Sequence, residues 1–329
     1  MITLSKIAQL AHVSVSTASK AFSMSSEVSE QTRQEIFRIA KEYGCFKKFY
    51  TAKYPKYVVA VVCPEFHGRY YSSMVAALQD ELRGRNCEMC VASTDFSEEA
   101  ERSLLEYYHN YANVDGIIMI GGKVPIPENY EIPVISVIPN CRQPGGSRLR
   151  AGGVCLRVDY RQALSRVVRH FQEEGIDSIG FIGERYTTGK LLIFRQVMKE
   201  AGLPCQHVTT GGRFESGGYR SMEILLSAES RPRAVVCAYD HLAIGVLRCL
   251  ADHGLRVPDD MAVVGMDNIP EAQYLIPALS SIDFCIPETC RRAAKSIVEL
   301  IGGSDQVSSC TLTAELMLRE SSGLSNQNA

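Results

Sequence analysis

Residues 234–245 read AVVCAYDHLAIG, and this stretch decides the fold. Its first five residues form an apolar, β-rich run, and a helical segment over His241–Gly254 follows the pair Tyr239-Asp240. A buried strand that leads directly into a helix is the first part of a β-α-β unit. We therefore expect a parallel sheet that carries this helix on one of its faces.

The same alternation extends on both sides of this stretch. Further buried strands are expected at Tyr57–Cys63, Cys87–Ala92, Gly116–Ile120, Pro133–Ile138, Ser178–Gly183 and Met261–Met266. Helices are expected near Ser72–Arg85, Glu98–Ala112, Arg161–Glu174, Lys190–Ala201 and Gly217–Ala228. Two such runs in succession predict an α/β body of two similar lobes, each with a parallel sheet covered by helices on both faces.

Polar and aromatic residues follow several of the expected strands. They are Pro64–Tyr71, Tyr186–Lys190, the pair Tyr239-Asp240, and the pair Asp267-Asn268. Ligands of parallel sheets bind at the carboxyl ends of the strands. Aromatic rings can stack on a polyhydroxylated ring while carboxylates accept its hydroxyls. Any one of these residues is more often a helix cap or a solvated loop residue, but their recurrence favours a ligand cleft between two lobes.

The N-terminal segment has the pattern of three short helices. The first has Thr3 as its cap, the second begins after Ser14, and the third begins after Ser29 and ends at Gly44. Apolar stripes are expected on the first helix (Leu4, Ile7, Ala8, Ala11), the second (Val15, Ala18, Phe22) and the third (Ile36, Ile39, Ala40, Tyr43). The turn between the first two helices, at His12 and Val13, has the length that a helix-turn-helix requires.

The outward face of the second helix suits DNA. It carries Ser16, Thr17, Ser19 and Lys20, whose short hydroxyls and single cation can approach base edges and phosphates in a major groove. Residues 1–57 carry nine Lys/Arg against four acids, a charge of +5, while the whole chain is at −2. A basic head on an acidic body indicates a polyanionic partner. A three-helix bundle used for protein contacts remains the alternative.

Composition excludes several other classes of protein. No apolar run reaches the length of a membrane span, and the N-terminus lacks the pattern of a signal peptide, so we expect a cytoplasmic protein with no membrane partner. The twelve cysteines are scattered through apolar stretches, which favours small core residues, and the Cys87–Cys90 pair has no matching second pair for a metal. No nucleophile, base and orienting group are paired by spacing, so neither an enzyme nor a cofactor is expected.

The head resembles the DNA-binding domain of the LacI/GalR family of bacterial repressors. Three segments carry the resemblance: Thr3–Ala8, Val13–Lys20 and Val28–Arg33. His12 stands where the family usually has Gly, and Lys20 stands where Arg is usual. The resemblance implies that Val15 and Ser16 face base edges. It also implies that base edges or phosphates are held by Thr3, Ser14, Thr17, Ser19, Lys20, Ser29 and Thr32.

The body resembles the same family over 234–245 and, most closely, over 254–268. The resemblance implies a two-lobed, periplasmic-binding-protein-like body over 58–329. Lobe one would comprise about 58–158 and 284–311, and lobe two about 159–283 and 312–329, with crossings near Val158, Asp283 and Thr311. Implied effector contacts are Tyr70 or Tyr71, Asp159, Lys190, Phe214, Asp240, Asp267 and Phe284. Lys190 replaces the usual Arg, and Tyr239 replaces the usual Asn.

The segment 47–57 joins the head (1–46) to the body and departs from the family pattern. Family members usually have a short hinge helix here, with a Leu that enters the minor groove, whereas this chain has no Leu and carries Pro55. Phe49 or Tyr50 could serve as the wedge. A basic tether that only touches phosphates is the alternative.

Together these features predict a homodimeric transcriptional repressor that binds a pseudo-palindromic double-stranded DNA operator. Its operator affinity would be controlled by a small effector, a sugar or sugar derivative, bound between the lobes. The alternatives are a sugar-binding transport receptor, an enzyme that uses the same cleft, and a cytoplasmic sugar-binding sensor with weak or altered DNA binding. Whether the effector releases DNA or promotes its binding stays open.

Overall fold

The structure is a computed structural model that describes residues 2–50, 57–127, 130–139 and 153–323. The head comprises α1 (Leu4–Leu10), α2 (Val15–Phe22), α3 (Glu30–Glu42) and α4 (Phe46–Phe49). The expected caps are confirmed, since Thr3, Ser14 and Ser29 each accept the backbone N–H of the residue three positions on. His12 makes the turn between α1 and α2 with a φ of 53°, the left-handed conformation that glycine adopts without strain.

The head is held together by a small core under its helices. Phe22 is 2% exposed and stacks on Phe37, with ring centroids 5.5 Å apart. Two expectations about this core were wrong. Val15 is 46% exposed, because the inward positions of α2 are taken by Ala18, Ala21 and Phe22. Tyr43 is 53% exposed, because α3 ends at Glu42 and the chain turns away from the helical path at that point.

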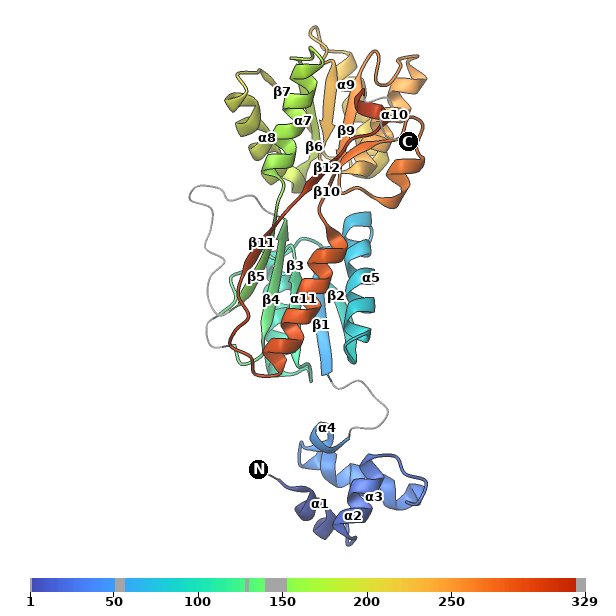
Figure 1. Cartoon of the computed structure of the whole chain (residues 1–329), viewed down its shortest axis with the longest axis vertical. Helices are drawn as coiled ribbons and strands as arrows, with labels where there is room; N and C mark the ends of the chain where they lie inside the picture. The colour runs from blue at the N-terminus through green and yellow to red at the C-terminus, as the bar shows by residue number, and fades with distance from the viewer. Residues whose placement is uncertain (1, 51–56, 128–129, 140–152, 324–329) are drawn as a thin grey trace.

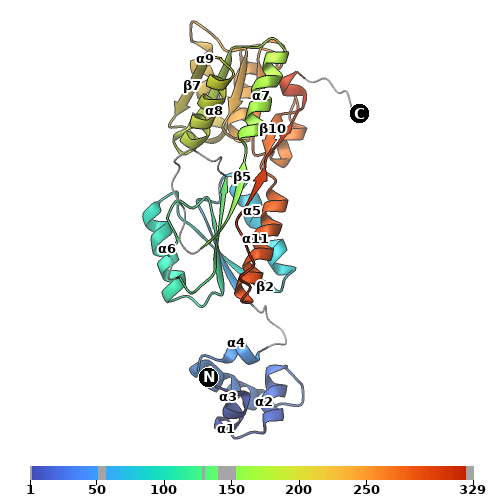
Figure 2. The same ribbon diagram turned by 60° about the vertical axis from the view of Figure 1, so that its left-hand side comes forward.

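Lobe one is a parallel sheet in the strand order β11-β5-β4-β3-β1-β2. Its strands are β1 (Tyr57–Cys63), β2 (Cys87–Ser93), β3 (Gly116–Ile120), β4 (Val134–Pro139), β5 (Val154–Asp159) and β11 (Cys310–Thr313). The helices α5 (Arg69–Arg83) and α11 (Ile286–Ile301) cover one face, and α6 (Glu98–Asn110) covers the other (Figures 1 and 2). Strand β1 is buried throughout its last five residues. Val59 and Val61 face the layer of α5 and α11, and Ala60 and Val62 face the layer of α6.

Lobe two repeats this plan in the order β12-β10-β9-β8-β6-β7. Its strands are β6 (Ile179–Glu184), β7 (Cys205–Thr210), β8 (Ala234–Cys237), β9 (Ala262–Met266), β10 (Ser280–Asp283) and β12 (Glu315–Met317). Its helices are α7 (Arg161–Glu173), α8 (Thr188–Glu200), α9 (Phe214–Leu226) and α10 (Asp240–Asp252), which pack as the pairs α7–α8 and α9–α10. The sheet is parallel except for β12, which runs antiparallel to β10.

Within the described residues the chain passes between the lobes three times (Figure 1). It passes from β5 into α7, from β10 into α11, and from β11 into β12. The first and third passages are joined, because the N–H of Ala314 donates to the carbonyl of Asp159 over 2.8 Å. The second passage lies beside the third, where the Cys285 thiol donates to the carbonyl of Thr313 at 3.6 Å.

Helices α9 and α10 lie so close together that two glycines are required at their contact. A Cβ on Gly218 would lie 2.0 Å from the carbonyl oxygen of Leu242, and a Cβ on Gly245 would lie 1.9 Å from that of Glu215. Real carbon–oxygen contacts are far longer, so any larger residue would push the helices apart. This contact fixes the N-terminal ends of both helices, which carry Phe214 and Asp240.

Candidate DNA-binding and effector sites

The outer face of α2 is available to a partner. Val15, Ser16 and Ser19 are exposed on this helix, and within the described part of the chain no hydrogen bond occupies the Ser16 or Ser19 hydroxyl. The exposure of Val15 contradicts its expected inward position and suits a residue that contacts bases. This face therefore offers one methyl-rich side chain and two free hydroxyls, which can contact thymine methyl groups and base edges.

Other hydroxyls of the predicted DNA surface are used to cap helices. Ser14 Oγ accepts the N–H of Thr17 at 3.0 Å and lies 2.8 Å from the Thr17 hydroxyl. Ser29 and Thr32 repeat this arrangement at the start of α3, with their hydroxyls 2.8 Å apart. Thr3 caps α1 through the N–H of Lys6. These side chains orient the first turns of the helices, whose N–H groups favour phosphate.

The positive charge of the head is distributed unevenly. Arg33 is 8% exposed and holds the carbonyls of Ser25 and Val28, so its charge is structural. Lys20 pairs with Glu27, and Arg38 pairs with Glu35 and Glu42. Among the described side chains of the head, three cations have no carboxylate partner and are available to an anionic partner: Lys6, Lys41 and Lys48.

The two aromatic residues considered as a minor-groove wedge pack against the head instead. Phe49 lies 5.6 Å from the Phe22 ring, and Tyr50 lies 5.1 Å from Phe37 and stacks on Phe46 at 4.8 Å. We call these five residues the aromatic cluster: Phe22, Phe37, Phe46, Phe49 and Tyr50. The rest of the tether, Thr51–Lys56 with Pro55, lies outside the described residues. In this structure Phe49 and Tyr50 serve the stability of the head.

In the body, Lys190 and Asp267 meet at the carboxyl ends of the lobe-two strands. Lys190 Nζ donates to Asp267 Oδ1 at 3.3 Å and to the carbonyl of Ala238 at 2.6 Å. The same ammonium lies 4.9 Å from the centre of the Phe284 ring. Both charged side chains are largely shielded from water, with exposures of 18% and 10%. The pair forms a compact site in which the Asp267 carboxylate accepts hydrogen bonds and the Lys190 ammonium donates them.

Aromatic residues of lobe one adjoin this pair. Tyr70 contacts Tyr71 and Phe284 edge to face, with ring centroids 5.3 and 5.7 Å apart. Burial, reinforced by neighbouring groups that include Asp267, raises the pKa of both tyrosines above the ordinary value. Both phenols are therefore neutral donors at physiological pH. The structure thus brings together Tyr70, Tyr71, Lys190, Asp267 and Phe284.

The remaining predicted contacts lie at other places. Asp159 Oδ1 accepts the N–H of Arg161 at 2.9 Å, which orders the first passage between lobes. The N–H of Phe214 donates to the Tyr239 hydroxyl at 3.1 Å. Asp240 is fully buried inside lobe two, where it accepts the N–H of Ile269 at 2.8 Å and the Ser281 hydroxyl at 2.6 Å. In this structure both oxygens of Asp240 are occupied by lobe two.

The burial of Asp240 predicts a pH effect on stability. Desolvation, helped by Asp267, raises the pKa of this carboxyl from 3.8 to about 8. Between about pH 4 and pH 8 the folded protein therefore holds a proton that the unfolded chain has released. The contribution of this proton to the free energy of unfolding is full below about pH 4 and is lost as pH rises to about 8. In thermal unfolding from pH 5 to 9, Asp240→Asn should weaken the decline of Tm with pH. The exposed control Asp305→Asn should keep the wild-type slope, and an unchanged slope in Asp240→Asn would contradict the assignment.

Contacts across the cleft were not predicted from the sequence. Glu65 of lobe one makes a bidentate ion pair with Arg213 of lobe two, at 2.6 and 2.8 Å. The ring of Phe96 stacks on that of Tyr186 with centroids 3.9 Å apart and planes at 11°. Arg69 pairs with Glu271 at the same junction. Phe96 and Arg213 follow the edge strands β2 and β7, so inspection of those strand ends would have found them.

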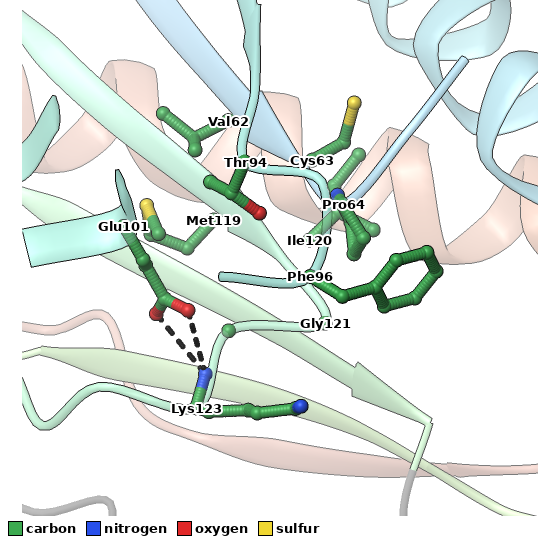
Figure 3. A pocket seen from close by; sticks show the side chains of 11 residues that line it. Val62, Cys63, Pro64, Thr94, Phe96, Glu101, Met119, Ile120, Gly121 and Lys123 are labelled. Atoms are coloured by element: carbon green, nitrogen blue, oxygen red, sulfur yellow. Dashed lines mark hydrogen bonds between the residues drawn. The ribbon is translucent and has the colours of Figure 1, made fainter. Parts of the chain in front are cut away.

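Beside these contacts, at the strand ends of lobe one, lies a cavity of about 10 Å³ (Figure 3). Phe96, Thr94 and Pro64 line one side of it, and Glu101 accepts the N–H of Lys123 at 3.0 and 3.1 Å on the other. A cavity of this size holds about one water molecule. The cavity is therefore too small for a sugar in this structure.

Two other kinds of feature are absent from the described residues. None of their helices has the length and apolar character needed to cross a bilayer. Nor do the side chains of residues 2–50, 57–127, 130–139 and 153–323 place three or more His, Cys, Asp or Glu together in a metal-binding group.

Comparisons with known proteins agree with this architecture. Residues 3–45 match the family described as bacterial regulatory proteins, lacI family, and residues 168–322 match the periplasmic binding protein-like domain. The regulator AscG of Escherichia coli (strain K12) is 25% identical over 98% of this chain and 98% of its own. The repressor PurR of Salmonella paratyphi B is 28% identical over 86% and 85%.

Solved structures share the whole fold. A LacI-family regulator from Silicibacter pomeroyi is 20% identical and superposes over 98% of this chain and 99% of its own, with a TM-score of 0.74. The lac repressor dimer bound to operator and an anti-inducer is 18% identical and superposes over 97% and 98%, with a TM-score of 0.73. A complex of the regulator CelR with cellobiose is 23% identical over 98% and 100%, with a TM-score of 0.66. The head thus matches the DNA-binding domain of the lacI family of bacterial regulatory proteins, and the body matches a periplasmic binding protein-like domain, in the same order as in regulators of that family.

Proposed function

We propose that this chain is a cytoplasmic transcriptional repressor that binds a pseudo-palindromic operator as a homodimer. The observation that carries the proposal is the outer face of α2, with Val15, Ser16 and Ser19 exposed on a head that matches the LacI family over residues 3–45. Each protomer would place one α2 in a major groove. The curated relatives AscG and PurR, named as a transcriptional regulator and a transcriptional repressor, support this proposal.

We further propose that a sugar or sugar derivative binds between the lobes and controls operator affinity. Lys190, Asp267, Tyr71 and Phe284 supply a cation, a carboxylate and aromatic surfaces at the strand ends. CelR, a structural neighbour, is described in complex with cellobiose. A ligand that stabilises one arrangement of the lobes shifts the population of DNA-binding dimers, by an amount that is typically about 1–3 kcal/mol. On this proposal the cleft binds its ligand without chemical change.

The DNA-binding assignment is tested with Ser16→Ala. We expect operator affinity, for a site selected from random DNA by the full chain, to fall roughly 5–150-fold, since one base contact is worth about 1–3 kcal/mol. Binding to unrelated DNA should change little, because phosphate contacts dominate there. Fluorescence anisotropy on both DNAs measures the two affinities.

The matched control is Ser26→Ala, at an exposed serine of the loop that follows α2. It should retain both affinities. An equal loss on both DNAs in Ser16→Ala would remove α2 as the recognition helix. If random selection yields no preferred sequence with the wild-type chain, the function is that of a sugar sensor with weak DNA binding.

A further inference from the structure

Arg213 occupies the space between the lobes in the manner of a bound ligand. It comes from the N-terminal end of α9 in lobe two, and its guanidinium makes two hydrogen bonds to Glu65 of lobe one. Its Cζ lies 5.3 Å from the centroids of both Phe96 and Tyr186, and 4.6 Å from that of Phe214. A planar cation thus sits against three aromatic rings and a carboxylate, an arrangement that also recognises ammonium ligands.

The surroundings of Arg213 are rich in buried carboxylates. Glu65 is 6% exposed and Glu184 is 2% exposed. The carboxylate of Glu184 accepts the N–H of Tyr186 at 3.1 Å, and burial raises its pKa while the charge of Arg213 opposes that rise. The charge of Glu65 also raises the pKa of Glu184, so the two carboxyl groups lie in one negative region. Arg213 is the counter-charge of that region.

The difference in burial decides which partner a ligand displaces. Glu65 is the deeper of the two, and its position depends on Gly68, where a Cβ would lie 2.8 Å from Glu65 Oε1. The Arg213 side chain is 24% exposed, against 6% for Glu65, and its long side chain can swing into water. The Nε of Arg213 is buried without a hydrogen-bond partner among the described groups, so its removal sacrifices no bond at that atom. A ligand that enters the cleft therefore replaces Arg213.

The charge of the ligand follows from what Arg213 leaves behind. A neutral ligand would leave the buried Glu65 carboxylate without a counter-charge, which is strongly unfavourable. A phosphate or carboxylate on the ligand would face Glu65 and Glu184 with the same sign of charge. A ligand with a positively charged nitrogen replaces the guanidinium on both the carboxylate and the rings.

Resting on the proposed effector function, we propose that the effector is an amine-bearing sugar, and that Arg213 is a built-in stand-in for its cationic nitrogen. The ammonium would lie between Glu65, Phe96 and Tyr186, while the hydroxyls reach Lys190 and Asp267. Glu65 and Arg213 are then the residues that set the specificity of the cleft. A sugar phosphate and an acidic sugar are rejected by the same carboxylates.

The decisive experiment opens the position of Arg213 to an external cation. In the full-length variant Arg213→Ala, 10 mM methylguanidinium chloride should raise Tm by several degrees above the value in equimolar NaCl. Wild type, the exposed control Arg231→Ala, and the double variant with Glu65→Gln should show no such rise. A rise with acetate or phosphate in place of methylguanidinium, or no rise with any of them, would overturn the proposal. Should Arg213→Ala not fold, Arg213→Ser is used in the same way.

A second measurement uses the wild-type chain and matched sugars. The probes are the 2-amino hexoses, the parent hexoses and their 6-phosphates, each in the gluco, galacto and manno configurations. In at least one configuration the amino sugar should raise Tm more than both of its relatives, and Glu65→Gln should remove that preference. A larger rise with a neutral or phosphorylated hexose would overturn this inference while leaving the proposed effector function intact. If no sugar raises Tm, the methylguanidinium experiment alone supports or overturns the assignment of a cation site at Arg213.

Discussion

Phe22→Ala is expected to abolish DNA binding while the body stays folded. Phe22 is 2% exposed and contacts three other members of the aromatic cluster, so its truncation removes the centre of the head core. Loss of a buried Phe typically costs about 3–5 kcal/mol, which is comparable with the whole stability of a domain of this size. Specific and non-specific DNA affinity should both be lost, because no recognition helix or ordered basic surface remains.

Anisotropy measures the DNA affinities of Phe22→Ala, and the thermal unfolding of the body serves as an internal reference. The control is Tyr43→Ala, which truncates another aromatic residue of the same head that is 53% exposed. It should keep both DNA affinity and the body transition. Retention of wild-type DNA affinity in Phe22→Ala would show that the aromatic cluster does not hold the head together.

Gly245→Ala is expected to produce the largest loss of stability in the body. The added Cβ would lie 1.9 Å from the carbonyl oxygen of Glu215 and 2.8 Å from the N of Tyr219, so backbone atoms have to move. Overpacking of a core typically costs about 1–3 kcal/mol, and more where the obstacle is backbone. Since α9 and α10 begin at Phe214 and Asp240, their separation should also move Arg213 away from Glu65.

Thermal unfolding measures the effect of Gly245→Ala, and Gly189→Ala is its control. Gly189 also lies in a helix, but a Cβ there would meet nothing within 4 Å. The control should be neutral or slightly stabilised, since Ala is favoured over Gly in helices by about 1 kcal/mol. Equal Tm values for the two variants would mean that the helices adjust without cost.

The strand–helix alternation was visible in the sequence because its strands are buried on both sides. β1 and β3 have the bounds that the apolar runs indicated. Strand β7 was not predicted, because it lies at the edge of its sheet and reads CQHVTT, and none of its residues is fully buried. Where the chain returns to each lobe, the resemblance implied only the ranges 284–311 and 312–329, and the elements α11, β11 and β12 within them were not predicted. Strands β11 and β12 have only four and three residues and pair with strands far away in the chain, whereas the 16-residue α11 has an amphipathic pattern that the sequence does show.

The candidate site was only partly predictable for a similar reason. Strand ends located Lys190 and Asp267, which lie 77 positions apart and meet in space. Glu65 and Arg213 lie 148 positions apart and come from different lobes, so only the closure of the body brings them together. Composition also cannot tell a buried structural acid from a ligand-binding one. Asp240 and Asp267 both follow strands, yet lobe two occupies both oxygens of Asp240 in this structure.

The three passages between the lobes determine when each part can fold as the chain leaves the ribosome. The head is complete once residue 50 has emerged, so it can acquire its fold early. Lobe one lacks α11 and β11, and lobe two lacks β12, until almost the whole chain has been made. A chain that stops before residue 310 would thus present a finished head on two unfinished lobes with exposed sheet edges. Such a product is a target for proteolysis and aggregation, and the arrangement penalises incomplete synthesis of this regulator.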